Sequence, residues 1–124
     1  MFAPSALLLP VADPSASARF YAEILGLAPV EASPTFVLFV LPSGLALGLW
    51  DKAGVVPAPT AAAGCLEIGF KVANGAGVDA AHADWRAKGC MIALAPTDLD
   101  FGRSFVALDP DGHRLRVYAL YEEV

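Results

Sequence analysis

Side chains that could take part in catalysis are few in this sequence, and they form no known catalytic pattern. His82 lies in the middle of a helix-like stretch and His113 follows a turn glycine, so neither is placed as a metal ligand and both are expected to be solvent-facing or structural. There is no Ser-His-Asp order, no glycine-rich phosphate loop and no closely spaced carboxylate pair in a strand. Cys65 and Cys90 lack zinc-site or redox spacing and are expected to be buried. The sequence therefore predicts no catalytic residue.

Polar side chains that could contact a ligand gather in the segment Thr97 to Phe105, which reads TDLDFGRSF. Arg103 is either half of a structural ion pair with Asp98 or Asp100, or a hydrogen-bond donor to a ligand carboxylate. Ser104 is a weaker donor candidate. This segment is expected to lie at the mouth of a binding site.

These candidates must be positioned by a chain that shows one arrangement twice. An apolar run leads to Asp13, a helix-like stretch follows, and Gly26 ends it. About 60 residues later, Asn74 and Gly89 stand at the same two places. Asp13 and Ser15 are candidate N-caps, and a glycine such as Gly26 supplies the left-handed conformation that ends a helix. A two-module chain of this kind is expected to build its function in the groove between the modules.

The period of the apolar residues and the turn signals predict the elements of each module. The predicted helices are Ser15 to Leu25 and Val78 to Lys88. The predicted strands are Ala6 to Ala12, Thr35 to Val40, Leu45 to Trp50, Leu66 to Val72, Met91 to Ala95, Ser104 to Leu108 and Arg114 to Tyr118. Each module is thus a strand, a helix and a meander of about three strands, which gives an α+β fold of two tandem βαβββ modules.

The 124 residues are expected to form a single domain (1–124), with module one at 5–52, a connector at 53–64 and module two at 65–120. Because 56% of the residues are hydrophobic, the chain can bury a core. The net charge of -5 and the pI near 4.7 argue against a nucleic-acid partner, because no Lys/Arg stripe can release counterions. The longest apolar run, Phe36 to Leu41, is too short to cross a membrane, and no signal peptide is evident, so a cytoplasmic location is expected.

The two tandem modules, each closed by a hairpin with a Pro-x-Gly-type turn, resemble the vicinal oxygen chelate superfamily. That superfamily includes glyoxalase I, extradiol dioxygenases and the fosfomycin and bleomycin resistance proteins. The resemblance covers nearly the whole chain and is carried by Leu9 to Leu27, Glu67 to Val72 and Phe105 to Tyr118. It implies two curved sheets around a cup, at whose floor the enzymes hold a divalent metal with side chains from four strand positions.

The four metal positions of that superfamily fall here on Ala6, Gly48, Glu67 and Arg116. A divalent metal needs three or four convergent O, N or S donors, whereas these positions offer one carboxylate and one cation. The resemblance therefore implies that the metal site is lost and that no cofactor is bound. Glu67 and Arg116 are expected to form a charge-assisted, bidentate pair, either as a structural pair or as one that contacts a ligand.

Aromatic residues supply the rest of the expected site. Trp50 shares a strand face with Gly48 and is expected to point into the cup, next to the space that Gly48 leaves. There it is either a stacking platform for a planar ligand or ordinary core packing. Tyr118 shares the parity of Arg116 and is a second candidate wall, whereas Trp85 is assigned to the core. The register leaves open the facing of Phe36, Phe39, Phe101 and Phe105.

Within the superfamily, the sequence is similar to the phenazine antibiotic resistance proteins, a metal-free branch. The shared features are Trp50 at the end of module one, the Glu-Ile-Gly sequence at 67–69, and Phe-Gly-Arg-x-Phe at 101–105 before Asp-Pro-Asp-Gly-His at 109–113. The resemblance implies a homodimer that sandwiches a planar aromatic compound between aromatic side chains. The Ala-rich stretch at 58–63 departs from that branch.

The sequence thus predicts a metal-free binding protein that sequesters a small planar hydrophobic compound in two equivalent grooves of a homodimer. One alternative is a metal-dependent glyoxalase-like lyase or isomerase, or a dioxygenase. Another is a cofactor-independent proton shuttle with Glu67 as its base, which requires a raised pKa for that carboxyl. The predicted ligand-binding residues are Gly48, Trp50, Glu67, Arg103, Ser104, Arg116 and Tyr118.

Overall fold

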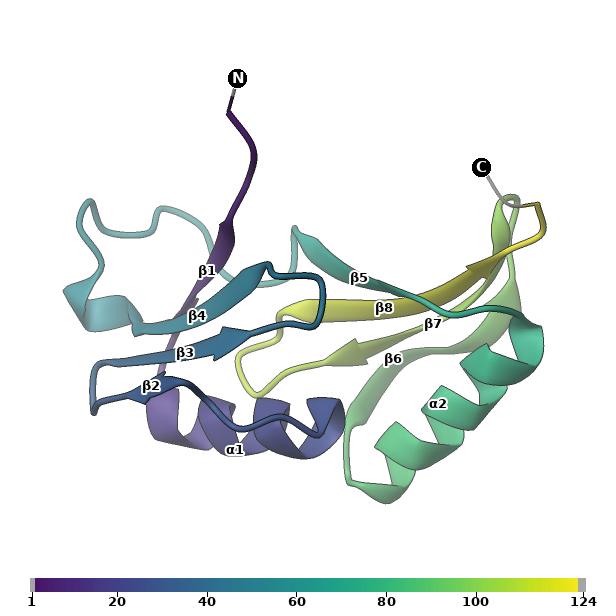
Figure 1. Ribbon diagram of the computed structural model, residues 1–124, viewed down its shortest axis with the longest axis horizontal. Coiled ribbons are helices and arrows are strands. Elements are labelled where there is room, and N and C mark those ends of the chain that lie inside the picture. Colours follow the sequence, from purple (N-terminus) through teal and green to yellow (C-terminus); the bar gives the residue numbers. More distant parts are fainter. Residues whose placement is uncertain (1, 123–124) are drawn as a thin grey trace. The chain divides into compact units, whose positions relative to one another are not determined.

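The computed structural model describes residues 2–122, which fold as two compact units with their boundary between Ala62 and Ala63. This boundary falls within the stretch 53–64 that the sequence predicts as a connector. Each unit, called module one and module two below, contains a four-stranded sheet and an α-helix (Figure 1). That the two modules form a cup between them stays a prediction.

Module one has the topology βαβββ. Its elements are β1 (Ala6–Val11), α1 (Pro14–Leu25), β2 (Glu31–Ala32), β3 (Phe36–Val40) and β4 (Ala46–Asp51), followed by a short 3-10 helix (Lys52–Gly54). The sheet order is β1-β4-β3-β2, with β1 parallel to β4 and the other pairs antiparallel.

The ends of helix α1 follow from its capping residues. The Asp13 carboxylate accepts hydrogen bonds from the backbone N–H groups of Ser15 (3.1 Å) and Ala16 (3.3 Å), and Pro14 occupies the first helical turn. At the other end Gly26 adopts φ 65°, a left-handed conformation that L side chains disfavour. The predicted cap and stop are both confirmed.

Module two repeats the topology. Its elements are β5 (Glu67–Lys71), α2 (Gly75–Ala87), β6 (Met91–Asp98), β7 (Gly102–Leu108) and β8 (Arg114–Leu120). The sheet order is β5-β8-β7-β6, with β5 parallel to β8 and the other pairs antiparallel. The predicted α+β fold of two tandem βαβββ modules is therefore confirmed.

Several element boundaries in module two differ from the prediction, and two of the differences have a clear physical reason. Helix α2 begins at Gly75 rather than Val78, because the Asn74 side chain accepts a hydrogen bond from the Gly77 N–H at 2.9 Å and caps the helix there. Strand β6 continues past Ala95 to Asp98 and includes Pro96. A proline is tolerated in β6 because this strand lies at the edge of its sheet.

The helix of each module packs on one face of its own sheet. In module one the buried apolar side chains of this core are Leu9, Val11, Tyr21, Ile24, Val37, Phe39, Leu47 and Leu49. In module two they are Ile68, Val78, Trp85, Phe105, Ala107, Leu115, Val117 and Ala119. Strand side chains alternate, so the residues between these point to the opposite face of each sheet.

The core of module two is organised around Phe105, which is fully buried. Its ring lies edge-on to Trp85 at 5.5 Å and to His82 at 5.3 Å between ring centroids. Trp85 therefore belongs to the core, as predicted, and His82 has a packing role. Burying an aromatic side chain of this size contributes about 2–3 kcal/mol to stability.

Two further observations bear on the sequence-based expectations. Cys90 is buried as predicted, but Cys65 is exposed, because it precedes β5 rather than lying within a strand. Among residues 2–122, no helix is long and apolar enough to span a membrane.

Candidate functional site

A hollow of about 460 Å³ lies on module two. Side chains from β5, β8 and the turn between β6 and β7 surround it. The lining residues are Glu67, Gly69, Leu99, Phe101, Arg116 and Tyr118. A concave region with aromatic walls and a few charged groups is typical of a small-molecule site.

Strand alternation places these residues on the face of the sheet that α2 leaves uncovered. In β8, Leu115 and Val117 are buried toward the helix, so Arg116 and Tyr118 point the other way. In the parallel neighbour β5, Gly69 stands in register with Arg116. The alternation of β8 thus brings the predicted residues Arg116 and Tyr118 into one site with Glu67.

Glu67 and Arg116 form the bidentate ion pair that was predicted. The Arg116 guanidinium donates from Nε to Glu67 Oε1 at 2.7 Å and from Nη2 to Oε2 at 2.9 Å. The side chain of Arg116 is only 18% exposed and that of Glu67 is 31% exposed. Two parallel charge-assisted hydrogen bonds fix both the distance and the orientation of the pair.

Two neighbours complete this cluster. Arg114 Nη2 lies 2.6 Å from Glu67 Oε2, so the carboxylate contacts two guanidinium groups. On the other side, Arg116 Nη1 donates to Ser104 Oγ at 2.9 Å. Ser104 is fully buried and does not line the hollow, so the structure gives it a supporting position beneath Arg116. Its predicted contact with a ligand stays untested.

The surroundings of Glu67 keep its carboxyl ionised. The hydrogen bond from Arg116 lowers the pKa of Glu67, partial burial opposes this, and the positive charges of Arg116 and Arg114 lower it further. The bond to Glu67 in turn raises the pKa of Arg116. The proton-shuttle alternative requires a raised pKa for Glu67, which is the opposite of the direction that these contacts favour.

Aromatic rings form the other side of the hollow. The rings of Phe101 and Tyr118 meet edge to face, with centroids 6.4 Å apart. Gly69 lies beneath them, and a Cβ atom at this position would approach Tyr118 Cε1 to 3.2 Å. The absence of a side chain at Gly69 therefore lets the Tyr118 ring lie close to the sheet.

Sequence reasoning missed four residues of this site and its supporting cluster: Gly69, Leu99, Phe101 and Arg114. Arg114 could have been found, because it shares the strand parity of Arg116 and Tyr118. The facing of Phe101 could not, because it depends on how the turn after β6 folds over β8.

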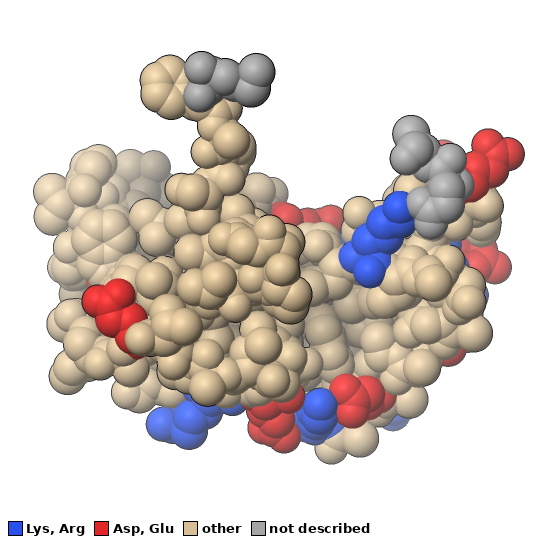
Figure 2. All heavy atoms as spheres, viewed as in Figure 1, with Lys and Arg blue, Asp and Glu red and all other residues tan. Residues whose placement is uncertain are grey.

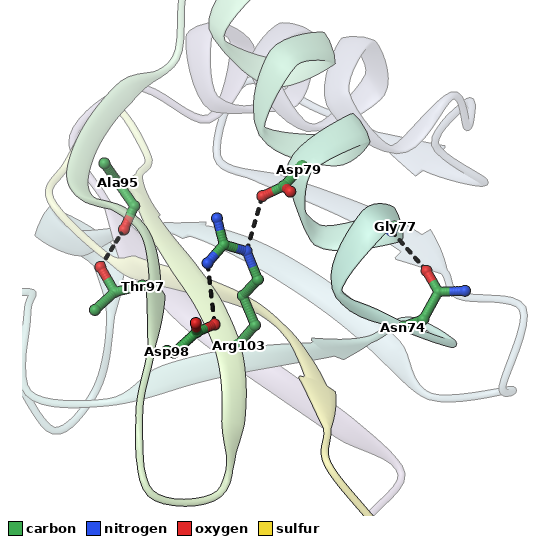
Figure 3. Close-up of polar contacts among 7 residues, drawn as sticks. All are labelled: Asn74, Gly77, Asp79, Ala95, Thr97, Asp98 and Arg103. Carbon is green, nitrogen blue, oxygen red and sulfur yellow. Dashed lines mark hydrogen bonds and ion pairs between the residues drawn. The ribbon is translucent and has the colours of Figure 1, made fainter.

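Arg103 lies elsewhere, on the side of the sheet that faces α2. Its Nε donates to Asp79 Oδ1 at 2.9 Å and its Nη1 to Asp98 Oδ1 at 3.0 Å (Figure 3). Hydrogen bonds to Asp98 and Asp79 raise the pKa of Arg103. The predicted pairing with Asp98 is confirmed. Strand β7 begins at Gly102 rather than at the predicted Ser104, so Arg103 lies within the strand, and it does not line the hollow. Its predicted role in ligand binding is untested.

The predicted residues Gly48 and Trp50 lie on module one. The expected space at Gly48 is absent: a Cβ atom there would lie 2.8 Å from Leu8 Cδ2 and 3.0 Å from the Phe36 ring. The space is filled because β1 and β3 flank β4, and their side chains Leu8 and Phe36 cover the glycine. Trp50 is partly exposed and meets Phe36 edge to face, with centroids 6.5 Å apart.

These residues are part of an apolar surface on module one, opposite α1. By strand register it comprises Ala6, Leu8, Pro10, Phe36, Leu38, Val40, Ala46, Gly48 and Trp50. In the view of Figure 2, few charged side chains are seen on module one. Glu31 of β2 stands in register with Leu38 and shares this face, so module one offers aromatic and aliphatic contacts beside one carboxylate.

A divalent metal does not fit the residues at the four superfamily positions. Ala6 and Gly48 have no donor atom, and Arg116 is a cation. The remaining donor, Glu67, has its oxygens bonded to two guanidinium groups, whose charge would repel a metal ion. Within residues 2–122, no three His, Cys, Asp or Glu side chains gather in a group that could hold one.

Comparison with known proteins gives one family and several similar chains. The family model of the Glyoxalase/Bleomycin resistance protein/Dioxygenase superfamily matches residues 4–117. The phenazine antibiotic resistance protein EhpR of Enterobacter agglomerans is 29% identical over 122 residues, which cover 94% of this chain and 92% of EhpR.

Two solved structures are similar over most of their length. The solution NMR structure of protein ATC0852 from Agrobacterium tumefaciens is 46% identical, with a TM-score of 0.90 and coverage of 98% of this chain and 100% of that one. A glyoxalase/bleomycin resistance protein/dioxygenase from Nocardioides is 25% identical, with a TM-score of 0.86 and coverage of 100% and 87%.

Proposed function

The chain belongs to the Glyoxalase/Bleomycin resistance protein/Dioxygenase superfamily, and on that premise we propose that it binds a small planar hydrophobic compound, without a metal, and sequesters it in the cytoplasm. One observation carries the proposal. The hollow of module two has aromatic walls, while its carboxylate and its guanidinium are bonded to each other. Such a site can hold and orient a molecule but has no group poised to transform it.

The chemistry of the charged groups favours binding over catalysis. A general base works best when its pKa lies near the operating pH. Arg116 and Arg114 lower the pKa of Glu67, which moves it away from neutral pH. Both carboxylate oxygens are already bound to a guanidinium group. Removing a proton from a substrate would require Glu67 to give up these contacts first.

The shape of the walls favours a planar ligand. Gly69 contributes no side chain to the floor, and Tyr118 and Phe101 stand beside it. A flat ring can slide between such groups and stack on one of them, which adds about 1 kcal/mol beyond the burial of apolar area. The similarity to the phenazine antibiotic resistance protein EhpR supports a planar aromatic compound as the ligand class.

The apolar face of module one supports two further parts of the proposal. Trp50 is partly exposed beside Phe36, so its ring offers another stacking surface for a planar compound. A largely apolar face of this kind is usually covered by a partner or a ligand. We therefore include in the proposal that Trp50 contacts the ligand and that the protein acts as a homodimer.

The direct test is calorimetric titration of the protein with phenazine as the probe. We expect saturable binding that weakens about ten-fold in Tyr118→Ala, because stacking on that ring and its apolar burial are lost. Tyr121→Ala is the matched control, since Tyr121 is 59% exposed and does not line the hollow. An equal loss in both variants, or no binding to the wild-type protein, would contradict the proposal.

The competing function is a metal-dependent lyase, isomerase or dioxygenase. Metal analysis of protein purified without chelators distinguishes the two. We expect less than stoichiometric Fe, Ni, Mn and Zn, whereas a full equivalent that disappears in Glu67→Gln would favour the enzyme.

A further inference from the structure

The charges at the floor of the hollow do not cancel. The single carboxylate of Glu67 is shared by Arg116 and Arg114, so the cluster of three side chains carries one more positive than negative charge. The chain as a whole is acidic, with a net charge of -5. This local excess of positive charge is therefore a property of the site and not of the protein's overall composition.

Arg116 still has donors to offer. A guanidinium carries five N–H groups. Arg116 uses one on Nε and one on Nη2 for Glu67, and one on Nη1 for Ser104. One N–H on each terminal nitrogen remains without a partner among the described residues. Because Arg116 lines the hollow, these donors are available to an acceptor group of a ligand.

Arg114 supplies the guanidinium that makes the cluster positive overall. It contacts Glu67 Oε2 at 2.6 Å but does not line the hollow. Its Nε is buried and has no hydrogen-bond partner in the described part of the chain. Without Arg114, Glu67 and Arg116 would form a neutral pair, and an anion at Arg116 would meet no net positive charge.

From this arrangement we propose that the hollow selects planar ligands that carry an anionic group, such as a carboxylate, and that Arg114 sets this preference through Glu67. The inference rests on the proposed function and specifies its ligand class. Arg114 acts as a positioning residue, because it neutralises the carboxylate that would otherwise repel the anion. The ligand's anionic group accepts hydrogen bonds from Arg116, and its ring packs on Tyr118 and Phe101.

A matched pair of probes tests the preference without any mutation. A phenazine carboxylate and the corresponding phenazine carboxamide have nearly the same shape and differ in charge. We expect wild-type protein to bind the carboxylate about ten-fold more tightly at low salt, and the ratio to shrink as salt screens the charges. Equal affinities, or tighter binding of the carboxamide, would overturn the inference.

Variants then test the role of Arg114. In Arg114→Gln we expect the ratio of carboxylate to carboxamide affinity to fall to about one, with a much smaller change for the carboxamide. Arg114→Lys retains the charge and should restore most of the ratio. Arg86→Gln is the control, because it removes the same charge from the exposed surface of α2. An equal fall in Arg86→Gln would assign the effect to overall charge and refute the role of Arg114.

The outcomes separate this inference from the function on which it rests. If the carboxamide and the carboxylate bind equally, the anion preference fails while sequestration of planar compounds stands. If neither probe binds to the wild-type protein, the proposed function fails. Thermal melting of each variant shows that it is folded, and the wild-type comparison decides the preference even where a variant does not fold.

Discussion

Glu67 receives both guanidinium groups of the site on its two carboxylate oxygens, and this explains why its pKa is lowered. A lowered pKa in the folded state means that folding favours the ionised carboxylate. The contribution of Glu67 to stability is therefore complete above the ordinary carboxylate pKa and is lost as the pH falls through the lowered value. The same residue thus links the binding site to acid stability.

We expect Glu67→Gln to reduce the free energy of unfolding by about 1 kcal/mol at pH 7, a modest value because the pair is partly exposed to solvent. The difference from wild type should shrink as the pH falls below about 4, because Glu67 then gains a proton in the unfolded chain before it does in the folded protein. Urea unfolding of both proteins at pH 7 and pH 3 measures this. A difference that stays constant or grows in acid would show that Glu67 does not act through its charge.

The hairpin formed by β6 and β7 is the element that completes the hollow, because its turn carries Leu99 and Phe101. The turn is attached to the end of β8 by the hydrogen bond from the Tyr121 N–H to the Phe101 carbonyl at 3.1 Å. Gly102, at φ 159°, lies against the backbone of β8, and a Cβ atom there would overlap the Ala119 carbonyl. The position of the Phe101 wall therefore depends on a glycine outside the lining.

Gly102→Ala is expected to destabilise the protein by at least about 2 kcal/mol, since backbone atoms cannot move away cheaply from the added methyl group. It should also weaken phenazine binding, because the turn that carries Phe101 must shift. Gly54→Ala is the control, since its Cβ would meet only Trp50 Nε1 at an ordinary 3.8 Å. Thermal unfolding and titration test both effects, and a Gly102→Ala protein as stable as Gly54→Ala would refute this view of the hairpin.

The ends of a helix could be predicted where the residues that set them lie next to it in the sequence. The cap at Asp13 and the stop at Gly26 act within a few residues of their own helix, so the sequence shows them directly. Contacts between distant residues were not predictable in this way. The Arg103 partner Asp79 is 24 residues away on α2, and the covering of Gly48 by Leu8 and Phe36 requires the order of three strands.

The Glu67–Arg116 pair spans 49 residues and was nevertheless predicted, because the superfamily resemblance places both residues at one site. Composition and periodicity alone could not have joined them. The third member of the cluster, Arg114, was missed because the resemblance assigns it no role. Arg114 is identified only by its contact with Glu67 in the structure.

At the scale of the whole molecule, one topology appears twice with different chemistry. Both modules are βαβββ units with a helix on one face of the sheet. The opposite face is mostly apolar in module one, with Glu31 at its edge, and carries the Arg114–Glu67–Arg116 cluster in module two. The two modules thus differ in the contacts that each can offer: stacking on aromatic rings in module one, and charge recognition beside aromatic rings in module two.

Native mass spectrometry of the protein incubated with a phenazine carboxylate tests the central claim most directly, because it reports assembly, stoichiometry and the mass of the ligand together. We predict a species of twice the 12.9 kDa chain mass that holds two ligand molecules, each released at its original mass. A monomer with bound ligand would remove only the homodimer from the account. Release of a ligand of altered mass, or a metal ion in the complex, would contradict binding without conversion.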